Sequence, residues 1–227
     1  MSYTTVSLEF SNSMKKAIVL GSGIGGILSA KVLSDYFDEV LIVDKKKELQ
    51  GKSVQSQHLH VMLASGRELL EGFFPGIDKK LADRGAPLID WARDTSWTGA
   101  FGIYPQYESR IITRSASRAL IEELIFEEII KNKKVKFMGA FEFSNFITEN
   151  NKIVAIQSKD KTQLKGDFYI NSMGRQNPLK TNQKIKIDAE VTYTSIELKN
   201  KNPVKLPGSR PGASAAPLSF FGRLNLK

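Results

Sequence analysis

The chain has 227 residues, of which 41% are hydrophobic and 25% are charged, as in an ordinary globular protein that can bury a substantial core. It contains no cysteine, so disulfides, thiolate catalysis and thiolate metal sites are excluded. Its net charge of +9 comes from scattered lysines without interleaved aromatic residues, which favours a solvated basic surface over binding to nucleic acid or an anionic membrane.

The first part of the chain, residues 1–14, is predicted to be a polar lead before the first strand. It has neither the basic start nor the apolar stretch of a secretory signal. No run of about 18 apolar residues occurs in the chain, so we expect no segment to span a membrane. These features favour a cytoplasmic protein.

A glycine-rich pattern follows in residues 15–47. Residues 17–20 are a short apolar run, which predicts a parallel strand buried on both faces. Apolar residues then recur at helical spacing as far as Phe37, and a second apolar run, residues 40–43, ends in Asp44. Between the first run and the predicted helix lie the glycines of a G-x-G-x-x-G motif, Gly21, Gly23 and Gly26.

Each of these residues has a physical role in binding a dinucleotide. Gly21 permits a tight turn, Gly23 lets the backbone approach a pyrophosphate, and Gly26 lets helix and strand pack closely. Asp44 follows Gly26 by 44 − 26 = 18 residues, close to the spacing at which an acid accepts hydrogen bonds from a ribose. An acid there disfavours a 2′-phosphate, although the lysines that begin at Lys45 weaken that argument. The unit indicates dinucleotide binding without deciding between NAD and FAD.

The next segments predict a helical region. Residues 48–60 form a polar connection, residues 61–74 are predicted to be a helix stopped by Pro75, and residues 77–84 add a short helical turn. Residues 86–113 suggest irregular strands and turns around Trp91 and Trp97. A further helix, with Ser115 and Ser117 as candidate caps, carries an apolar stripe formed by Leu120, Ile121, Leu124, Ile125, Ile129 and Ile130.

The last structured part is rich in predicted strands. Residues 135–138 suggest a third parallel strand, and residues 141–148 and 153–157 flank a hairpin turn at Asn150 and Asn151. Residues 168–171 form another short strand that opens into a loop, SMGRQNP. The tail differs in composition, with many Ala, Gly, Pro and Ser residues. We interpret residues 201–227 as a flexible linker or a non-native tail, and both interpretations predict disorder.

Several segments, taken together, resemble the FAD-dependent monooxygenase superfamily that includes p-hydroxybenzoate hydroxylase. They look closest to its branch of bacterial FAD-dependent hydroxylases and epoxidases. The resemblance is collinear, extends over about residues 15–200 and corresponds to the amino-terminal part of such proteins. Its matching segments are VLGSGIGGILSAKVLSDYFDEVLIVDKK, QSQHLHVMLASGRELLEGFFPG, SASRALIEELIFEEI and GDFYINSMGR.

The resemblance implies an α/β fold. The implied architecture is a Rossmann-like, glutathione-reductase-type FAD-binding domain of three layers over residues 15–200, with an inserted antiparallel meander. Part of a substrate-domain sheet is expected at about residues 86–113. The implied activity is NAD(P)H-dependent hydroxylation or epoxidation of a small organic substrate by bound FAD.

The resemblance also implies individual roles. The FAD pyrophosphate would lie on the glycine loop, and the adenosine ribose on Asp44 beside Lys45. Arg118 matches the family arginine that contacts the cofactor, and Gly174 matches a loop that approaches it. In that last loop the chain departs from the family, with Asn171 at an acidic position and Met173 where a small residue is usual. The loop residues expected at the pyrophosphate are Gly21, Ser22, Gly23, Ile24, Gly25 and Gly26.

The two histidines of the chain, His58 and His60, are two positions apart. In an extended segment they would point to opposite sides, so we expect no shared metal. Their match to a Q-x-x-H-x-H element implies that Gln55, His58 and His60 are loop residues near the flavin, and it leaves their chemical role open. No catalytic residue is assigned.

A second cofactor motif of the family, a Gly-Asp pair followed by a proline-bearing loop, does not occur after residue 180. The leading hypothesis is therefore an FAD-binding oxidoreductase represented by its amino-terminal part. The alternative is a dinucleotide-binding remnant without turnover.

Overall fold

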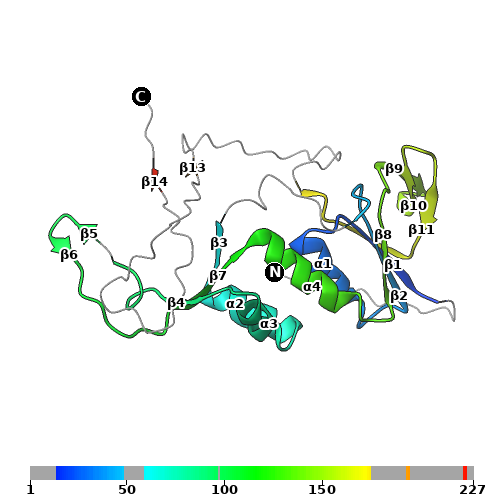
Figure 1. Ribbon diagram of the computed structural model, residues 1–227. Helices are drawn as coiled ribbons and strands as arrows, with labels where there is room; N and C mark the ends of the chain where they lie inside the picture. Colours follow the sequence, from blue (N-terminus) through cyan, green and yellow to red (C-terminus); the bar gives the residue numbers. More distant parts are fainter. Residues whose placement is uncertain (1–13, 49–58, 97, 175–192, 195–221, 224–227) are drawn as a thin grey trace, which may run out of the picture. The chain divides into compact units, whose positions relative to one another are not determined.

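The computed structural model describes residues 14–48, 59–96, 98–174, 193–194 and 222–223 (Figure 1). The chain divides into two compact units. The first is formed by residues 1–49 and 129–178, and the second by residues 50–128 and 179–227. Among the described residues, no helix has the length and apolar character needed to cross a membrane.

The first unit is built on a parallel sheet of four strands in the order β12-β1-β2-β8. Every neighbouring pair in this sheet is parallel, as predicted for the apolar runs. One helix, α1, connects β1 to β2. The bounds are β1 Lys16–Leu20, α1 Ile24–Leu33, β2 Glu39–Val43, β8 Val135–Met138 and β12 Phe168–Asn171. The predicted α/β class is confirmed at this level.

A three-stranded antiparallel meander completes the first unit. It consists of β9 Phe143–Glu149, β10 Lys152–Ser158 and β11 Gln163–Lys165, in the order β11-β10-β9. Asn150 and Asn151 have φ angles of 50° and 60°, the left-handed conformation that a tight hairpin turn requires, and the predicted hairpin is confirmed.

The parallel strands bury both of their faces. Ile18 and Leu20 of β1 belong to a core cluster with Ile156 of the meander. Val19, which points to the opposite face, has its Cγ1 atom 3.5 Å from the position that a Cβ would take at Gly26 of α1. Burial on both faces explains why the sequence of β1 is a continuous apolar run and does not alternate apolar with polar residues.

The second unit contains the antiparallel sheet β3-β7-β4 and three helices. Their bounds are β3 Leu59–Met62, α2 Ala64–Phe73, α3 Ile77–Asp83, β4 Leu88–Asp90, β7 Ile112–Ser117 and α4 Arg118–Ile129. A two-stranded hairpin, β5 Thr98–Gly99 with β6 Gly102–Ile103, lies between β4 and β7.

Two sequence predictions in this unit are wrong in detail. Val61 was expected in a helix but lies in β3, because it pairs with Ser115 of β7 and the helix α2 begins only at Ala64. Ser115 therefore does not cap α4. Ser117 does, since its hydroxyl accepts a hydrogen bond from the N–H of Leu120 at 3.2 Å.

A buried ion pair joins α3 to the sheet of the second unit. Arg114 of β7 is 3% exposed, and its guanidinium donates to both carboxylate oxygens of Asp78 at 2.7 and 2.8 Å. Arg67 of α2 lies 3.3 Å from the same carboxylate. The hydrogen bonds from Arg114 hold the pKa of Asp78 below its ordinary value. The charged form of Asp78 therefore fixes α3 against β7.

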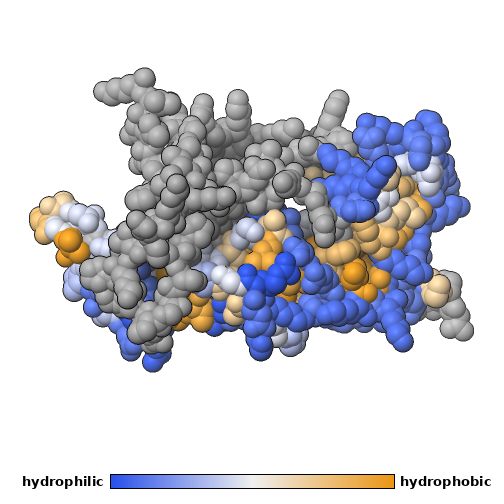
Figure 2. Space-filling model, in the orientation of Figure 1, coloured by the Kyte–Doolittle hydropathy of each residue, from blue (hydrophilic) through white to orange (hydrophobic). Residues whose placement is uncertain are grey.

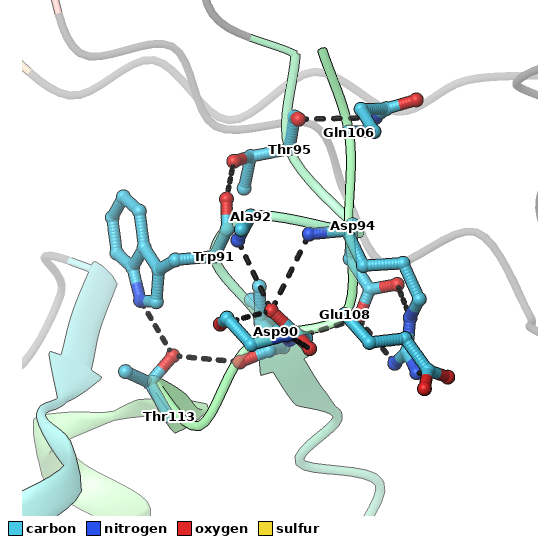
Figure 3. A network of polar contacts seen from close by, with 11 residues as sticks. Asp90, Trp91, Ala92, Asp94, Thr95, Gln106, Glu108 and Thr113 are labelled. Atoms are coloured by element: carbon cyan, nitrogen blue, oxygen red, sulfur yellow. Dashed lines mark hydrogen bonds and ion pairs between the residues drawn. The ribbon is translucent and has the colours of Figure 1, made fainter.

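A second polar network orders the irregular segment after β4 (Figure 3). Asp90, at the end of β4, is 2% exposed and accepts hydrogen bonds from the hydroxyl and N–H of Ser109 at 2.5 and 2.8 Å. The N–H groups of Ala92 and Arg93 also donate to it. These bonds, those from Ser109 first, lower the pKa of Asp90 to about 2. Trp91, predicted to pack in this segment, donates from its indole N–H to Thr113 at 2.9 Å.

The β5–β6 hairpin within this segment carries exposed apolar side chains. Phe101 is fully exposed and Ile103 is 74% exposed. In Figure 2 the hairpin appears as an apolar projection at the left. The Asp90 network thus orders the two ends of the segment between β4 and β7. The β5–β6 hairpin in the middle of that segment carries the exposed apolar side chains.

The predictions for residues 1–14 and for Trp97 lie outside the described residues, apart from Met14. Most of the predicted tail, residues 201–227, lies outside them too. The described residues of the last part form two short strands, β13 Tyr193–Thr194 and β14 Gly222–Arg223, which pair antiparallel.

Asp90→Asn should change how stability depends on pH. The pKa of Asp90 in the fold, about 2, lies below its ordinary value of 3.8, so ionised Asp90 stabilises the fold above about pH 4. That contribution is lost as the pH falls from about 4 toward 2. The difference in melting temperature between the wild type and Asp90→Asn, followed by circular dichroism, should therefore shrink over this range. Asp35→Asn, at an exposed aspartate of the first unit, is the control, and an equal pH trend in both variants would contradict the assignment.

Candidate dinucleotide site at the carboxyl edge of the parallel sheet

The glycine turn after β1 is packed so closely that two of its glycines are required by the protein itself. A Cβ at Gly26 would lie 1.9 Å from the carbonyl oxygen of Gly21. Gly21 has a φ of +100°, and a Cβ there would lie 2.5 Å from the carbonyl oxygen of Ser172. The N–H of Gly21 donates to the carbonyl oxygen of Val43 at 2.8 Å, which ties the turn to the end of β2.

The other two glycines of the turn face open space. A Cβ at Gly23 or at Gly25 would meet no atom of the described residues within 4 Å. Gly23 is the residue that precedes α1, and no side chain caps the helix. The first intrahelical bond found there runs from the N–H of Ile27 to the carbonyl oxygen of Gly23 at 3.0 Å. The preceding N–H groups of the first turn therefore have no partner within the helix and can serve an anion.

Asp44 is held at the same edge of the sheet by its neighbours. Its N–H donates to the carbonyl oxygen of Met138 at 3.1 Å, and its own carbonyl oxygen accepts from the N–H of Phe141 at 2.9 Å. Its carboxylate accepts from the N–H and hydroxyl of Ser22 at 2.8 and 2.6 Å, and from the N–H of Lys46 at 3.0 Å.

These donors keep the carboxylate ionised. Burial by itself would raise the pKa of Asp44, but the hydrogen bonds from Lys46 and Ser22 outweigh it, and the pKa lies below its ordinary value. Asp44 is therefore charged near neutral pH and can accept hydrogen bonds, as a ribose hydroxyl requires. This chemistry fits the role that the sequence predicts for it.

A third loop reaches the same place from the end of β12. The N–H of Ser172 donates to the carbonyl oxygen of Leu20 at 2.7 Å, so this loop continues alongside the glycine turn. The side chain of Met173 packs against the core cluster. The side-chain oxygen of Asn171 accepts from the N–H of Met173 at 3.2 Å, a bond that an acid in this position would also make. Gly174, with a φ of +61°, ends the described part of this loop.

The remaining predicted residues are placed less completely. Lys45 is exposed beside Asp44. Arg118 opens α4 in the second unit, where its Nε donates to Glu122 at 2.9 Å, and its role toward a cofactor stays a prediction. Gln55 and His58 lie outside the described residues. The backbone of His60 pairs with Ala116 in the sheet β3-β7.

The second unit has an open hollow of about 510 Å³ along α2, lined by Ser65, Glu68, Leu69, Gly72 and Phe73. None of its lining residues is a predicted site residue. Within the described ranges, no group of three or more His, Asp or Glu side chains could hold a metal ion. The glycine turn therefore remains the best candidate site.

Two contacts at this site were not anticipated from the sequence. One is the double hydrogen bond from Ser22 to Asp44, since Ser22 had been expected at the pyrophosphate. The other is the N–H of Lys46, which also donates to Asp44. The first could have been found, because adjacent parallel strands bring the residues after their carboxyl ends together and a serine there can donate to an acid.

Comparisons with known proteins point to one fold. No protein family has a model that matches the chain. Protein Rv3254 of Mycobacterium tuberculosis is 28% identical over 96 residues, which are 40% of this chain and 20% of that protein. Among solved structures, PqsL, a probable FAD-dependent monooxygenase from Pseudomonas aeruginosa, has a TM-score of 0.51 and 15% identity. The match covers 67% of this chain and 40% of that one.

A second solved structure is the Diels-Alderase PyrE3 of pyrroindomycin biosynthesis, with a TM-score of 0.54 and 14% identity over 81% of this chain and 36% of that one. The chain spans less than half the length of each of these relatives. The chain therefore has the α/β fold found in FAD-dependent monooxygenases, and the predicted resemblance is confirmed as a likeness of fold to a part of such proteins.

Gly26→Ala should destabilise the first unit, because its Cβ would be forced against the carbonyl oxygen of Gly21. We expect a loss of about 3 kcal/mol in the free energy of unfolding. Gly25→Ala, one position earlier and facing open space, is the matched control and should be neutral or stabilising by up to about 1 kcal/mol. Urea titrations of the two variants measure the difference. Equal stability of the two would show that the turn and α1 do not pack as described.

Proposed function

We propose that this chain is the FAD-binding part of an oxidoreductase of the flavin monooxygenase type. Its first unit would then be a Rossmann-like domain of the glutathione-reductase type. The observation that carries the proposal is the glycine turn. Gly21 and Gly26 are required by packing, whereas the space beside Gly23, at the amino end of α1, is left free by the protein.

The residues present fit the cofactor. The unpartnered N–H groups at the start of α1 and the positive end of the helix dipole suit a pyrophosphate. Asp44 would accept from the adenosine ribose, with Lys45 beside it. Gly174 would lie along the cofactor. A contact from Arg118 is what the resemblance implies, since a guanidinium suits phosphate or flavin oxygens.

The chemistry of such a protein belongs to the cofactor, because bound FAD, reduced by NAD(P)H, supplies the oxygen-transfer chemistry. The chain's own contribution is binding and orientation. An ionised Asp44 fixes the sugar, and the close-packed turn fixes the diphosphate relative to the sheet. A small organic molecule is the proposed substrate class. PqsL, which shares the fold, has been solved in complex with 2-aminobenzoylacetate.

Gly23→Val tests the proposal directly. The backbone of Gly23, with φ −70° and ψ 177°, is open to any residue, and its Cβ position is free, so the variant should fold. Its side chain would occupy the space proposed for the pyrophosphate. We expect at least a tenfold loss of FAD affinity, measured by quenching of flavin fluorescence. Gly72→Val, at an equally open glycine of α2, is the control and should bind FAD like the wild type. Unchanged FAD affinity in Gly23→Val would rule out pyrophosphate binding at the glycine turn.

The alternative is a dinucleotide-binding protein without redox turnover. It is favoured by PyrE3, a Diels-Alderase of the same fold. A shared fold does not decide the reaction. The two functions differ in a simple assay of the purified protein loaded with FAD. A monooxygenase should oxidise NADPH or NADH with matching uptake of O₂, whereas a binding protein should retain the yellow cofactor and consume neither.

A further inference from the structure

Ser22 is committed to Asp44 by both of its donors. Its side chain is buried, with 4% of the residue exposed. Its hydroxyl lies 2.6 Å and its N–H 2.8 Å from the same oxygen, Oδ2 of Asp44. Neither group is therefore directed at a ligand, and the phosphate-facing donors of the turn begin at Gly23.

The two oxygens of Asp44 are consequently not equivalent. A carboxylate offers about four acceptor positions, two on each oxygen. On Oδ2 both are taken by Ser22. On Oδ1 one is taken by the N–H of Lys46 at 3.0 Å. Within the described part of the chain, these three hydrogen bonds leave one acceptor position, and it lies on Oδ1.

We propose that Ser22 is a positioning residue that restricts Asp44 to one of the two hydroxyls of an adenosine ribose, bound through Oδ1. This inference rests on the proposed function, since it assumes that the ribose of a dinucleotide lies at Asp44. It adds that Ser22 determines which ribose hydroxyl Asp44 binds, whereas the sequence pattern assigns Ser22 to the pyrophosphate.

The restriction has a measurable consequence. If Asp44 accepts from a single hydroxyl, removing that hydroxyl from the ligand costs a charged hydrogen bond, whereas removing the other costs little. A charged hydrogen bond corresponds to about tenfold or more in affinity. Without the Ser22 hydroxyl, one position on Oδ2 becomes free, and both ribose hydroxyls can be bound.

The experiment compares ADP, 2′-deoxy-ADP and 3′-deoxy-ADP as ligands of the full chain by isothermal titration calorimetry. In the wild type the dissociation constants of the two deoxy analogues should differ by about tenfold. In Ser22→Ala that ratio should fall to near one. Ser22→Cys, whose slightly larger thiol fills the space of the hydroxyl and is only a weak donor, should behave in the same way without leaving a small cavity. Ser29→Ala, which removes a hydroxyl bonded to Gly25 within α1, is the control and should keep the wild-type ratio.

The ratio of the dissociation constants of the two deoxy analogues distinguishes a positioning role of Ser22 from a purely structural one. If Ser22 only stabilised the turn, its loss would weaken all three ligands by a similar factor and leave the ratio unchanged, which would overturn the inference. A ratio near one in the wild type would overturn it as well. Absence of ADP and FAD binding in the folded wild type would instead contradict the proposed function, and the inference would fail with it.

A second readout is the pH dependence of ADP binding. The Ser22 hydroxyl is one of the hydrogen bonds that lower the pKa of Asp44. In Ser22→Ala the pKa should rise, so ADP affinity should begin to fall at a higher pH on acidification than in the wild type. If ADP affinity fell over the same pH range in the two proteins, the hydrogen bond from the Ser22 hydroxyl to Asp44 would be contradicted.

Discussion

The candidate site depends on the close approach of two backbone segments. The first turn of α1 rests against the carbonyl group of Gly21, at a distance that leaves no room for a side chain at Gly26. This contact sets the amino end of the helix beside the carboxyl end of β1. Because the neighbouring strands are parallel, their carboxyl ends meet at the same edge of the sheet. Asp44 and the Ser172 loop lie at that edge because each directly follows one of these strands.

In the proposed function, Asp44 has two tasks that compete for the same atoms. Its carboxylate satisfies the N–H groups of Ser22 and Lys46, which would otherwise be left unpaired in a partly buried turn. The same carboxylate is the acceptor available to a sugar. A group that both shapes a loop and contacts a ligand is already oriented when the ligand arrives, and the ordering cost of binding is correspondingly small.

In the second unit, buried polar contacts add to an apolar core that includes Ile77, Leu81 and Ile125. Arg114 and Asp78 join α3 to the sheet, and Asp90 holds together the two ends of the irregular segment between β4 and β7. Such segments lack the regular ladders that satisfy backbone groups, so side-chain carboxylates accept from several N–H groups instead. The shared fold with PqsL and PyrE3, at 14 to 15% identity, extends to proteins with different named activities, which is why the reaction has to be argued from the site.

The sequence by itself determined the local elements that have a period or a special residue. The parallel strands appeared as unbroken apolar runs, α1 as an apolar helix behind its glycines, and the meander turn as two asparagines. It also determined the α/β class and the glycine–acid pattern, since these depend on residues close together in the chain.

The tertiary structure decided what depends on distant partners. Val61 lies in a strand because β7 is beside it, although its surroundings in sequence favour a helix. Met173, where the family pattern has a small residue, packs against a core cluster formed by residues distant in the sequence. Ser22 donates to Asp44 because the strands that precede the two residues, β1 and β2, are neighbours in the sheet, and that pairing is a property of the tertiary structure.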